Sequence, residues 1–178
     1  MKTILILLCL FSTVVKAEAL AGNYELKKSS VKYMVTYLIK HAEGESLESK
    51  GKGECKGEIC EFLVAAPVKS FTSKDSNRDL NMLAATKADK FPLAVVHLKT
   101  KSDISSGKLI ADLEVEFAGV KKSYPGVVFT ATQVNDGFQV SGKFDLFPTK
   151  HNIEKPSLLG VSIEENVPVT IVAHWKKI

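Results

Sequence analysis

The sequence is poor in several residues that mark particular protein classes. Its 178 residues include three Cys and one Trp, and Arg78 is the only arginine among the 24 basic residues. Three cysteines are too few for a small domain held together by disulfides, and a hydrophobic fraction of 45% argues against a disordered chain. A formal net charge of +4, spread along the chain, gives no reason to expect a nucleic-acid partner. The length fits one globular domain.

Residues 1–17 are typical of an export signal. A basic second residue is followed by a mostly apolar run that ends at Val15. This run is shorter than the roughly 20 residues of a transmembrane helix, so we expect cleavage after residue 17, with Ala21 as the alternative site. No later segment is long and apolar enough to cross a bilayer. The prediction is one mature domain over residues 22–178, in the periplasm or secreted.

Apolar and polar residues alternate along most of the mature sequence. Over 109–117, apolar residues at odd positions alternate with Asp112, Glu114 and Glu116 at even positions. Because successive strand side chains point to opposite faces, such a segment has one buried and one solvated side. The clearest alternating segments are 31–37, 109–117, 138–146 and 167–175, and further strands are expected near 44–54, 59–68, 93–101 and 123–134.

Residues 74–90 interrupt the strand pattern. Leu80, Met82 and Leu83 follow a spacing closer to that of a helix, with Ser76 as its expected N-cap. The rest has short turns and little helix between strands, which favours an antiparallel meander. The expected fold class is therefore all-β, and the apolar faces of the strands are buried either in a sandwich or in a closed barrel. A barrel of about eight strands is filled by side chains or holds one small ligand.

Four segments of the mature sequence occur in an informative order. Ser29–Tyr33 is a serine followed by alternating apolar residues, and Leu113–Lys122 is a strand that ends in a glycine-containing turn and basic residues. Between them, Asn77–Leu83 holds an Arg-Asp pair in a short helix, and Lys90–Pro92 is an aromatic-proline approach to the next strand. This order resembles the YceI family, exported bacterial proteins that bind polyisoprenoids or other long-chain lipids. The resemblance implies a single lipocalin-like antiparallel barrel with one short helical excursion.

One loop departs from that family pattern. Many members carry an Arg-x-Asp-Phe-Gly-like stretch where this chain has Pro148–Ile153, and only Ile153 clearly agrees. The following Pro156–Gly160 resembles a variant of the loop found in other members. If this loop shapes the mouth of the barrel, the ligand of better-known relatives does not carry over to this chain.

The resemblance implies a long apolar ligand, namely a polyisoprenoid, an isoprenoid quinone or a fatty-acid derivative, held for carriage, storage or sequestration. Burial of such a chain is favourable without specific polar contacts. A lipid-modifying enzyme and a ligand-free stress-response or interaction module are the alternatives, although no catalytic motif nominates a nucleophile or base. We expect no cofactor and leave a homodimer open. The expected lining is Tyr33, Val35, Tyr37, Phe62, Val64, Leu113, Val115, Phe117, Phe129, Phe138, Val140, Phe144, Val169 and Ile171.

Arg78 and Asp79 are the most informative polar pair. A planar guanidinium presents a fork of donors that lysine cannot replace, so a lone arginine in a lysine-rich chain indicates a specific contact. Arg78 either ties the helical excursion to the barrel by hydrogen bonds or meets a ligand head group at the mouth. We favour the first role.

Cys55 and Cys60 are the cysteines that remain after signal removal. They flank a predicted hairpin turn, and an exported protein folds where disulfides form, so we expect a structural disulfide between them. A closed zinc site requires four ligands, and the spacing is not that of a thioredoxin-like Cys-x-x-Cys motif. The four histidines are scattered along the chain, and we expect no metal site.

Overall fold

The structure, a computed structural model, describes residues 20–38, 40–101, 107–155, 157–158 and 161–178. The expected export signal over 1–17 lies outside the described residues, so its cleavage stays a prediction.

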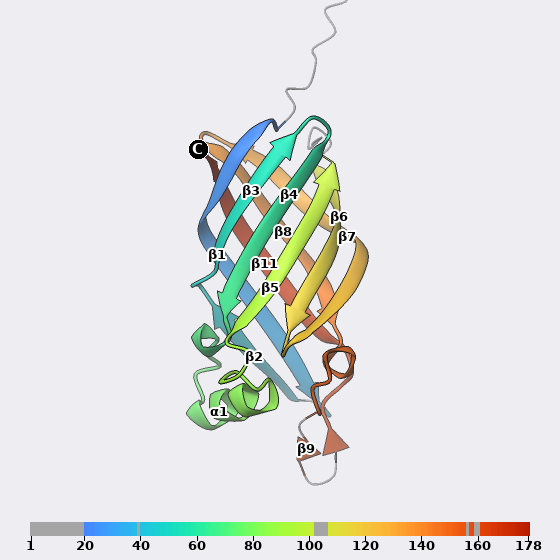
Figure 1. Cartoon of the computed structure of the whole chain (residues 1–178). Helices are drawn as coiled ribbons and strands as arrows, with labels where there is room; N and C mark the ends of the chain where they lie inside the picture. The colour runs from blue at the N-terminus through green and yellow to red at the C-terminus, as the bar shows by residue number, and fades with distance from the viewer. Residues whose placement is uncertain (1–19, 39, 102–106, 156, 159–160) are drawn as a thin grey trace, which may run out of the picture.

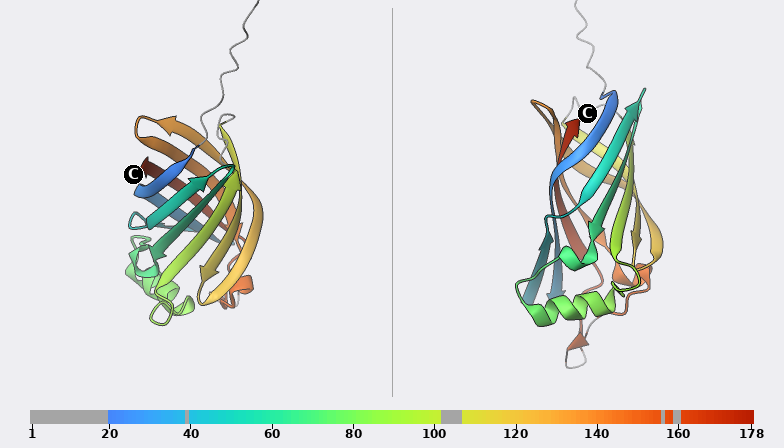
Figure 2. Two further views of the ribbon diagram at one scale, coloured as in Figure 1. Left: turned by 45° about the horizontal axis from the view of Figure 1, so that its top comes forward. Right: turned by 60° about the vertical axis from the view of Figure 1, so that its left-hand side comes forward.

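The described strands form one closed antiparallel barrel (Figure 1). Their order in the main sheet is β11-β8-β7-β6-β5-β4-β3-β1-β2, and β1 also pairs with β11, which closes every strand except β2 into a ring of eight (Figure 2). The barrel prediction is confirmed, and the sandwich alternative is wrong. The bounds are β1 (Gly22–Tyr37), β2 (Lys40–Ser46), β3 (Lys50–Lys56), β4 (Ile59–Pro67), β5 (Leu93–Lys101), β6 (Lys108–Phe117), β7 (Val120–Val134), β8 (Gly137–Leu146) and β11 (Val167–Lys177).

β1 is longer than its alternation predicts. It begins at Gly22 rather than near Val31, and its register against β11 shifts between Leu26 and Lys28. A residue inserted into one strand exchanges the inward and outward positions that follow it. The period-two pattern is therefore broken at this point, and the sequence reveals only the second half of the strand.

The single strand expected over 44–54 is wrong, because the structure divides it into β2 and β3. β2 places Ser46 opposite Val31 of β1, and β3 places Lys52 opposite Glu25. Both pairings follow the same register along β1, so β2 and β3 continue one another across the interruption at residues 47–49. That interruption lies opposite the part of β1 that contains the bulge, where the ladder cannot be regular.

Aromatic side chains close one end of the barrel interior. Tyr24, Phe62, Phe138 and Trp175 are buried, and the centroids of their contacting rings lie 4.7–6.2 Å apart in tilted or edge-on arrangements. Gly53 lies opposite Phe62 on the neighbouring strand, and a Cβ there would overlap the Phe62 ring. Glycine is thus required for this ring to lie flat on the strand, and the cluster fills the barrel at this end.

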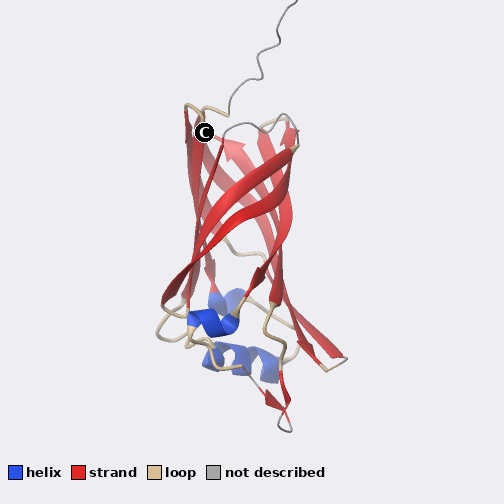
Figure 3. Cartoon of the chain, turned by 90° about the vertical axis from the view of Figure 1, so that its right-hand side faces the viewer, coloured by secondary structure: helices blue, strands red, loops and turns tan. Residues whose placement is uncertain are grey.

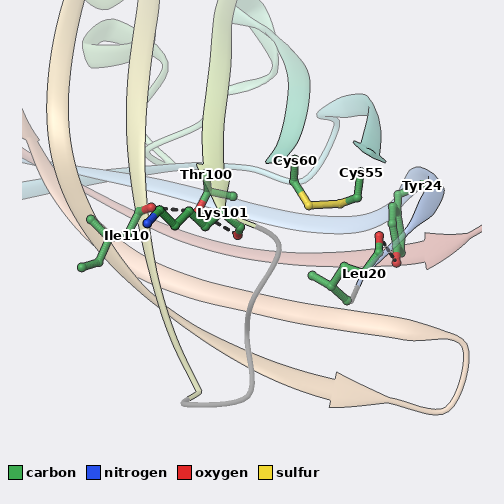
Figure 4. The surroundings of a disulfide bond; sticks show 7 residues. All are labelled: Leu20, Tyr24, Cys55, Cys60, Thr100, Lys101 and Ile110. Carbon is green, nitrogen blue, oxygen red and sulfur yellow. Dashed lines mark hydrogen bonds between the residues drawn. A yellow bond between two sulfur atoms is a disulfide. The ribbon is translucent and has the colours of Figure 1, made fainter. Parts of the chain in front are cut away.

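A disulfide staples the β3–β4 hairpin at the same end. Cys55 and Cys60 are directly paired across the two strands and joined by a disulfide, as expected (Figure 4). Close by, the Tyr24 hydroxyl donates to the Leu20 carbonyl at 3.1 Å. Closing so short a loop removes entropy from the unfolded chain and contributes on the order of 2 kcal/mol to stability. We call this the disulfide end.

Helices and short hairpins gather at the opposite end, which we call the α1 end (Figures 1 and 3). This clustering places helix α1 and the loop after β8 over the same opening of the barrel. The elements are η1 (Val68–Ser70), α1 (Ser76–Ala85), η2 (Pro148–His151), β9 (Ser157–Leu158) and β10 (Val161–Ser162).

The N-cap of α1 is Asp75, and the expectation of Ser76 is wrong. The Asp75 carboxylate accepts hydrogen bonds from the backbone N–H groups of Asn77 and Arg78, both at 3.1 Å. Asp and Ser are equally good N-caps, so propensity alone could not separate two adjacent candidates. The choice matters for the site, because it fixes a negative charge next to Arg78.

Candidate functional site

The barrel interior contains a cavity of about 520 Å³. It reaches from the aromatic cluster, where Phe62 and Trp175 border it, to α1, where Met82 borders it. A volume of this size lies within the roughly 300–1,000 Å³ range of small-molecule sites. The interior is therefore hollow, a point on which the sequence left both outcomes open.

Every strand residue that was predicted for the lining borders this cavity. On β6, Leu113 and Val115 are buried and face inward, whereas Glu114 and Glu116 are on the outside, where both carboxylates lie within 4 Å of the Lys121 ammonium. The acidic row of β6 is thus a solvated face. Whether the inward residues contact a ligand stays a prediction, and the structure shows only that they form the wall.

The α1 end adds lining residues that the strand pattern did not reveal. Met82 and Ala85 reach the cavity from one face of α1, and Phe71, Pro148 and Ile153 reach it from the loops. The three-residue spacing of Met82 and Ala85 was a visible sign of a one-sided helix. The loop residues carry no periodic signal, so only the tertiary fold shows that they belong to the wall.

The wall is poor in ionisable groups. Among the described lining residues there is no carboxylate, histidine, lysine or thiol, and Arg78 is the one cation. The described residues also contain no group of three or more side chains that could hold a metal ion. In the same part of the chain, no helix has both the length and the apolarity needed to span a membrane.

Arg78 lies on the cavity-facing side of α1 and contacts its own segment. Its Nε is 3.3 Å from a carboxylate oxygen of Asp75, and its Nη2 is 3.5 Å from the Ser73 carbonyl oxygen. The described residues include no hydrogen bond or ion pair from this guanidinium to a barrel strand. The geometry therefore gives no support to Arg78 as the tie between the excursion and the barrel.

Asp79 holds the loop that precedes α1. Its carboxylate accepts from the Ser73 backbone N–H at 2.8 Å, from the Ser73 hydroxyl at 2.6 Å and from the Thr72 hydroxyl at 3.1 Å. The Ser73 hydroxyl is the largest cause that lowers the pKa of Asp79 below its ordinary value. Asp79 is therefore ionised at neutral pH, and its carboxylate accepts its hydrogen bonds from the loop that precedes α1.

Tyr33 borders the cavity at the α1 end, close to Arg78 and Asp79. Its ring lies against Phe71, with centroids 5.9 Å apart, and it covers Gly44 of the neighbouring strand, where a Cβ would overlap the ring. Burial raises the pKa of Tyr33, and the charge of Asp79 raises it further, whereas that of Arg78 lowers it. The Tyr33 hydroxyl keeps its proton at neutral pH and is a hydrogen-bond donor in the wall.

No protein-family model matches the sequence, and no curated protein matches it. Solved structures do match its fold. A polyisoprenoid binding domain from Saccharophagus degradans, implicated in plant cell wall breakdown, has a TM-score of 0.74 and 13% identity over 87% of this chain and 98% of that one. BcnA from Burkholderia cenocepacia has a TM-score of 0.67 and 13% identity over 82% of this chain and 94% of its own.

A Campylobacter jejuni YceI protein covers 100% of this chain and 99% of its own, with a TM-score of 0.54 and 12% identity. This chain has the YceI-like barrel fold. Identities of 12–13% show the fold alone, so the ligand of this YceI-like barrel must be argued from its own cavity.

His151 anchors the loop at the α1 end of the YceI-like barrel. The side chain is fully buried, its Nδ1 is 3.0 Å from the Val120 carbonyl oxygen, and its Nε2 is 2.9 Å from the Tyr124 hydroxyl. A carbonyl can only accept, so Nδ1 carries the proton and the Tyr124 hydroxyl donates to Nε2 of a neutral ring. The nearby Pro148 and Ile153 border the cavity, so His151 fixes part of the wall.

Burial is the largest cause of a lowered pKa at His151. Hydrogen bonds to the backbone of Val120 and Phe117 oppose this effect, and the positive charges of Lys122 and Lys150 add to it. The His151 imidazole has a pKa of about 6.5 in the unfolded chain, and its pKa in the folded protein is lower. Proton uptake below pH 6.5 therefore favours the unfolded state, and the stability that neutral His151 provides is lost as pH falls through its folded pKa.

We expect the free energy of unfolding of the native protein to fall as pH decreases below 6.5, and His151→Gln to flatten that dependence. Urea unfolding at several pH values between 8 and 5 measures both slopes. His97→Gln, at an exposed position on β5, is the matched control and should keep the native slope. Equal slopes in the native protein and the His151 variant would contradict this role.

Proposed function

We propose that this YceI-like barrel binds a long-chain apolar ligand in its cavity and carries, stores or sequesters it in the periplasm or outside the cell. The observation that supports this most strongly is the apolar wall of a hollow barrel. A hydrocarbon chain moved from water into such a wall gains about 0.8 kcal/mol per methylene. The wall supplies this energy along its length without any specific polar contact.

Binding fits the wall better than catalysis does. An enzyme acting on a lipid needs a nucleophile, a general base or a metal near the reacting bond. The described lining holds no carboxylate, histidine or thiol, and its hydroxyl groups have no base beside them in the lining. The Cys55–Cys60 disulfide supports export, because such bonds persist in oxidising compartments.

An isoprenoid is the first ligand class to test. One solved protein of similar fold is named a polyisoprenoid binding domain, and branched isoprene units suit a wall of Val, Leu, Ile and Phe side chains. Fatty-acid derivatives use the same burial energy and form the second class. Both share the long apolar chain on which the proposal rests.

The only tryptophan of the chain gives a direct test, because Trp175 borders the cavity. After refolding to remove co-purified lipid, titration with n-alkanols of increasing length should change Trp175 fluorescence. Each added methylene should tighten Kd roughly fourfold, the equivalent of about 0.8 kcal/mol, until the cavity is full. A Kd that is independent of chain length would overturn the proposed function.

A further inference from the structure

The polar lining at the α1 end forms one cluster. Arg78 and Asn81 reach the cavity from α1, Ser73 from the preceding loop and Tyr33 from β1. Arg78 contacts the Ser73 backbone, and the charge of Arg78 acts on the Tyr33 phenol, which places these groups in one corner. The opposite end is closed by aromatic rings and the disulfide. An amphiphilic ligand therefore fits with its head group at α1 and its tail toward the aromatic cluster.

The groups that remain available in this corner include several hydrogen-bond donors. The Ser73 hydroxyl is used by Asp79, whereas the guanidinium of Arg78 has five N–H groups and makes contacts through only Nε and Nη2 among the described residues. The Asn81 carboxamide and the protonated Tyr33 hydroxyl supply further donors. This corner is complementary to a head group that accepts hydrogen bonds.

The charges in the corner do not favour an anionic head group. Asp75 lies 3.3 Å from Arg78 and compensates its charge, and Asp79 adds a second carboxylate one residue along the helix. The Asp75 carboxylate also occupies the backbone N–H groups at the start of α1. Helix N-termini often bind anions through those groups, but here a protein carboxylate has taken their place.

We propose that the ligand carries an uncharged oxygen acceptor, a carbonyl as in an ester or amide, which Arg78 and Asn81 bind at the α1 end. This inference rests on the proposed function and specifies the head group of the same ligand. Arg78 is then a specificity-determining residue, and Asp75 keeps the corner unsuited to carboxylates and phosphates. Asp79 has no contact with the ligand and maintains the loop that presents Arg78.

Three probes that share a twelve-carbon chain separate the head group from the tail: methyl laurate, laurate and dodecane. Titrated against Trp175 fluorescence at pH 8, the native protein should bind methyl laurate most tightly. Arg78→Gln should weaken the binding of methyl laurate by about tenfold, the loss expected for a hydrogen bond to a charged group. The same variant should leave the affinity for dodecane unchanged. Lys69→Gln, an exposed cation of the same region outside the lining, is the control and should change neither.

Asp75→Asn is the second arm of the experiment. Asn is as good an N-cap as Asp, so the helix is kept while one negative charge is removed beside Arg78. We expect laurate to bind several-fold more tightly to this variant, with methyl laurate unchanged. Unfolding midpoints of both variants check that the fold is intact.

Two results would overturn the inference while leaving the proposed function in place. One is laurate binding more tightly than methyl laurate to the native protein. The other is an equal loss of affinity for dodecane and for methyl laurate in the Arg78→Gln variant. If no probe binds to the native protein, the proposed function itself is wrong and the inference is lost with it.

Discussion

Replacing Phe62 with Ala is expected to lower the free energy of unfolding by about 3–5 kcal/mol. Phe62 is 4% exposed and contacts Tyr24, Phe138 and Trp175 at the disulfide end. Truncation removes the burial of a ring and leaves a space that the barrel strands cannot close, because each is held on both sides by its neighbours. It also uncovers the backbone at Gly53, on which the ring lies.

Leu63→Ala is the matched control for this prediction. Leu63 follows Phe62 on β4, points to the outer face and is 50% exposed. Its removal should change the free energy of unfolding by about 0.5 kcal/mol or less. Urea unfolding followed by circular dichroism measures both variants, and equal losses at the two positions would show that the aromatic cluster is not the core of this end.

The second large effect is expected on binding. Val96→Trp places an indole in the middle of the cavity, where Val96 pairs with Val64 and both side chains border the space. The added ring enters open volume rather than a packed core, so the fold should remain stable. If it displaces about four methylenes of ligand, the loss is about 3 kcal/mol, or more than a hundredfold in Kd.

His97→Trp controls for the indole itself. His97 is the next residue on β5 and is exposed on the outside of the barrel. Because each variant carries a second tryptophan, affinity is best measured by calorimetry with a long-chain alkanol. Native-like affinity in Val96→Trp, or an equal loss in both variants, would mean that the ligand does not occupy the cavity.

Strand alternation predicted which strand residues border the cavity. Leu113 and Val115 on β6 and Val169 on β11 follow the period of two that any half-buried strand obeys, so their inward direction could be read directly. The same rule failed on β1, where the bulge between Leu26 and Lys28 exchanged the two faces. The alternation of apolar and polar residues therefore gives the direction of strand side chains only where the strand pairing contains no bulge.

The sequence did not reveal whether the barrel is hollow. Large residues such as Phe62 and Phe138 can fill a barrel or line one, and the outcome depends on where along its axis they gather. Here they lie together at the disulfide end, where Gly53 accommodates the Phe62 ring, and the space toward α1 remains open. Such clustering depends on strand register, which residue composition does not determine.

The role of Arg78 was the least predictable part of the site. Its rarity drew attention to this segment, but the described residues include no hydrogen bond or ion pair from its guanidinium to a barrel strand. Asp79 holds the loop and Asp75 caps the helix, which leaves Arg78 toward the cavity. Adjacent charged residues differ in role through side-chain direction, and that direction follows from where α1 lies on the barrel.

The proposed function requires that the cavity holds a long-chain apolar molecule. Its most direct test is mass spectrometry of an organic extract of the native protein and of Val96→Trp, each expressed with its export segment and purified without detergent. We expect about one long-chain lipid per molecule of native protein and little or none in the variant. A native protein without lipid, or equal amounts in both extracts, would contradict it.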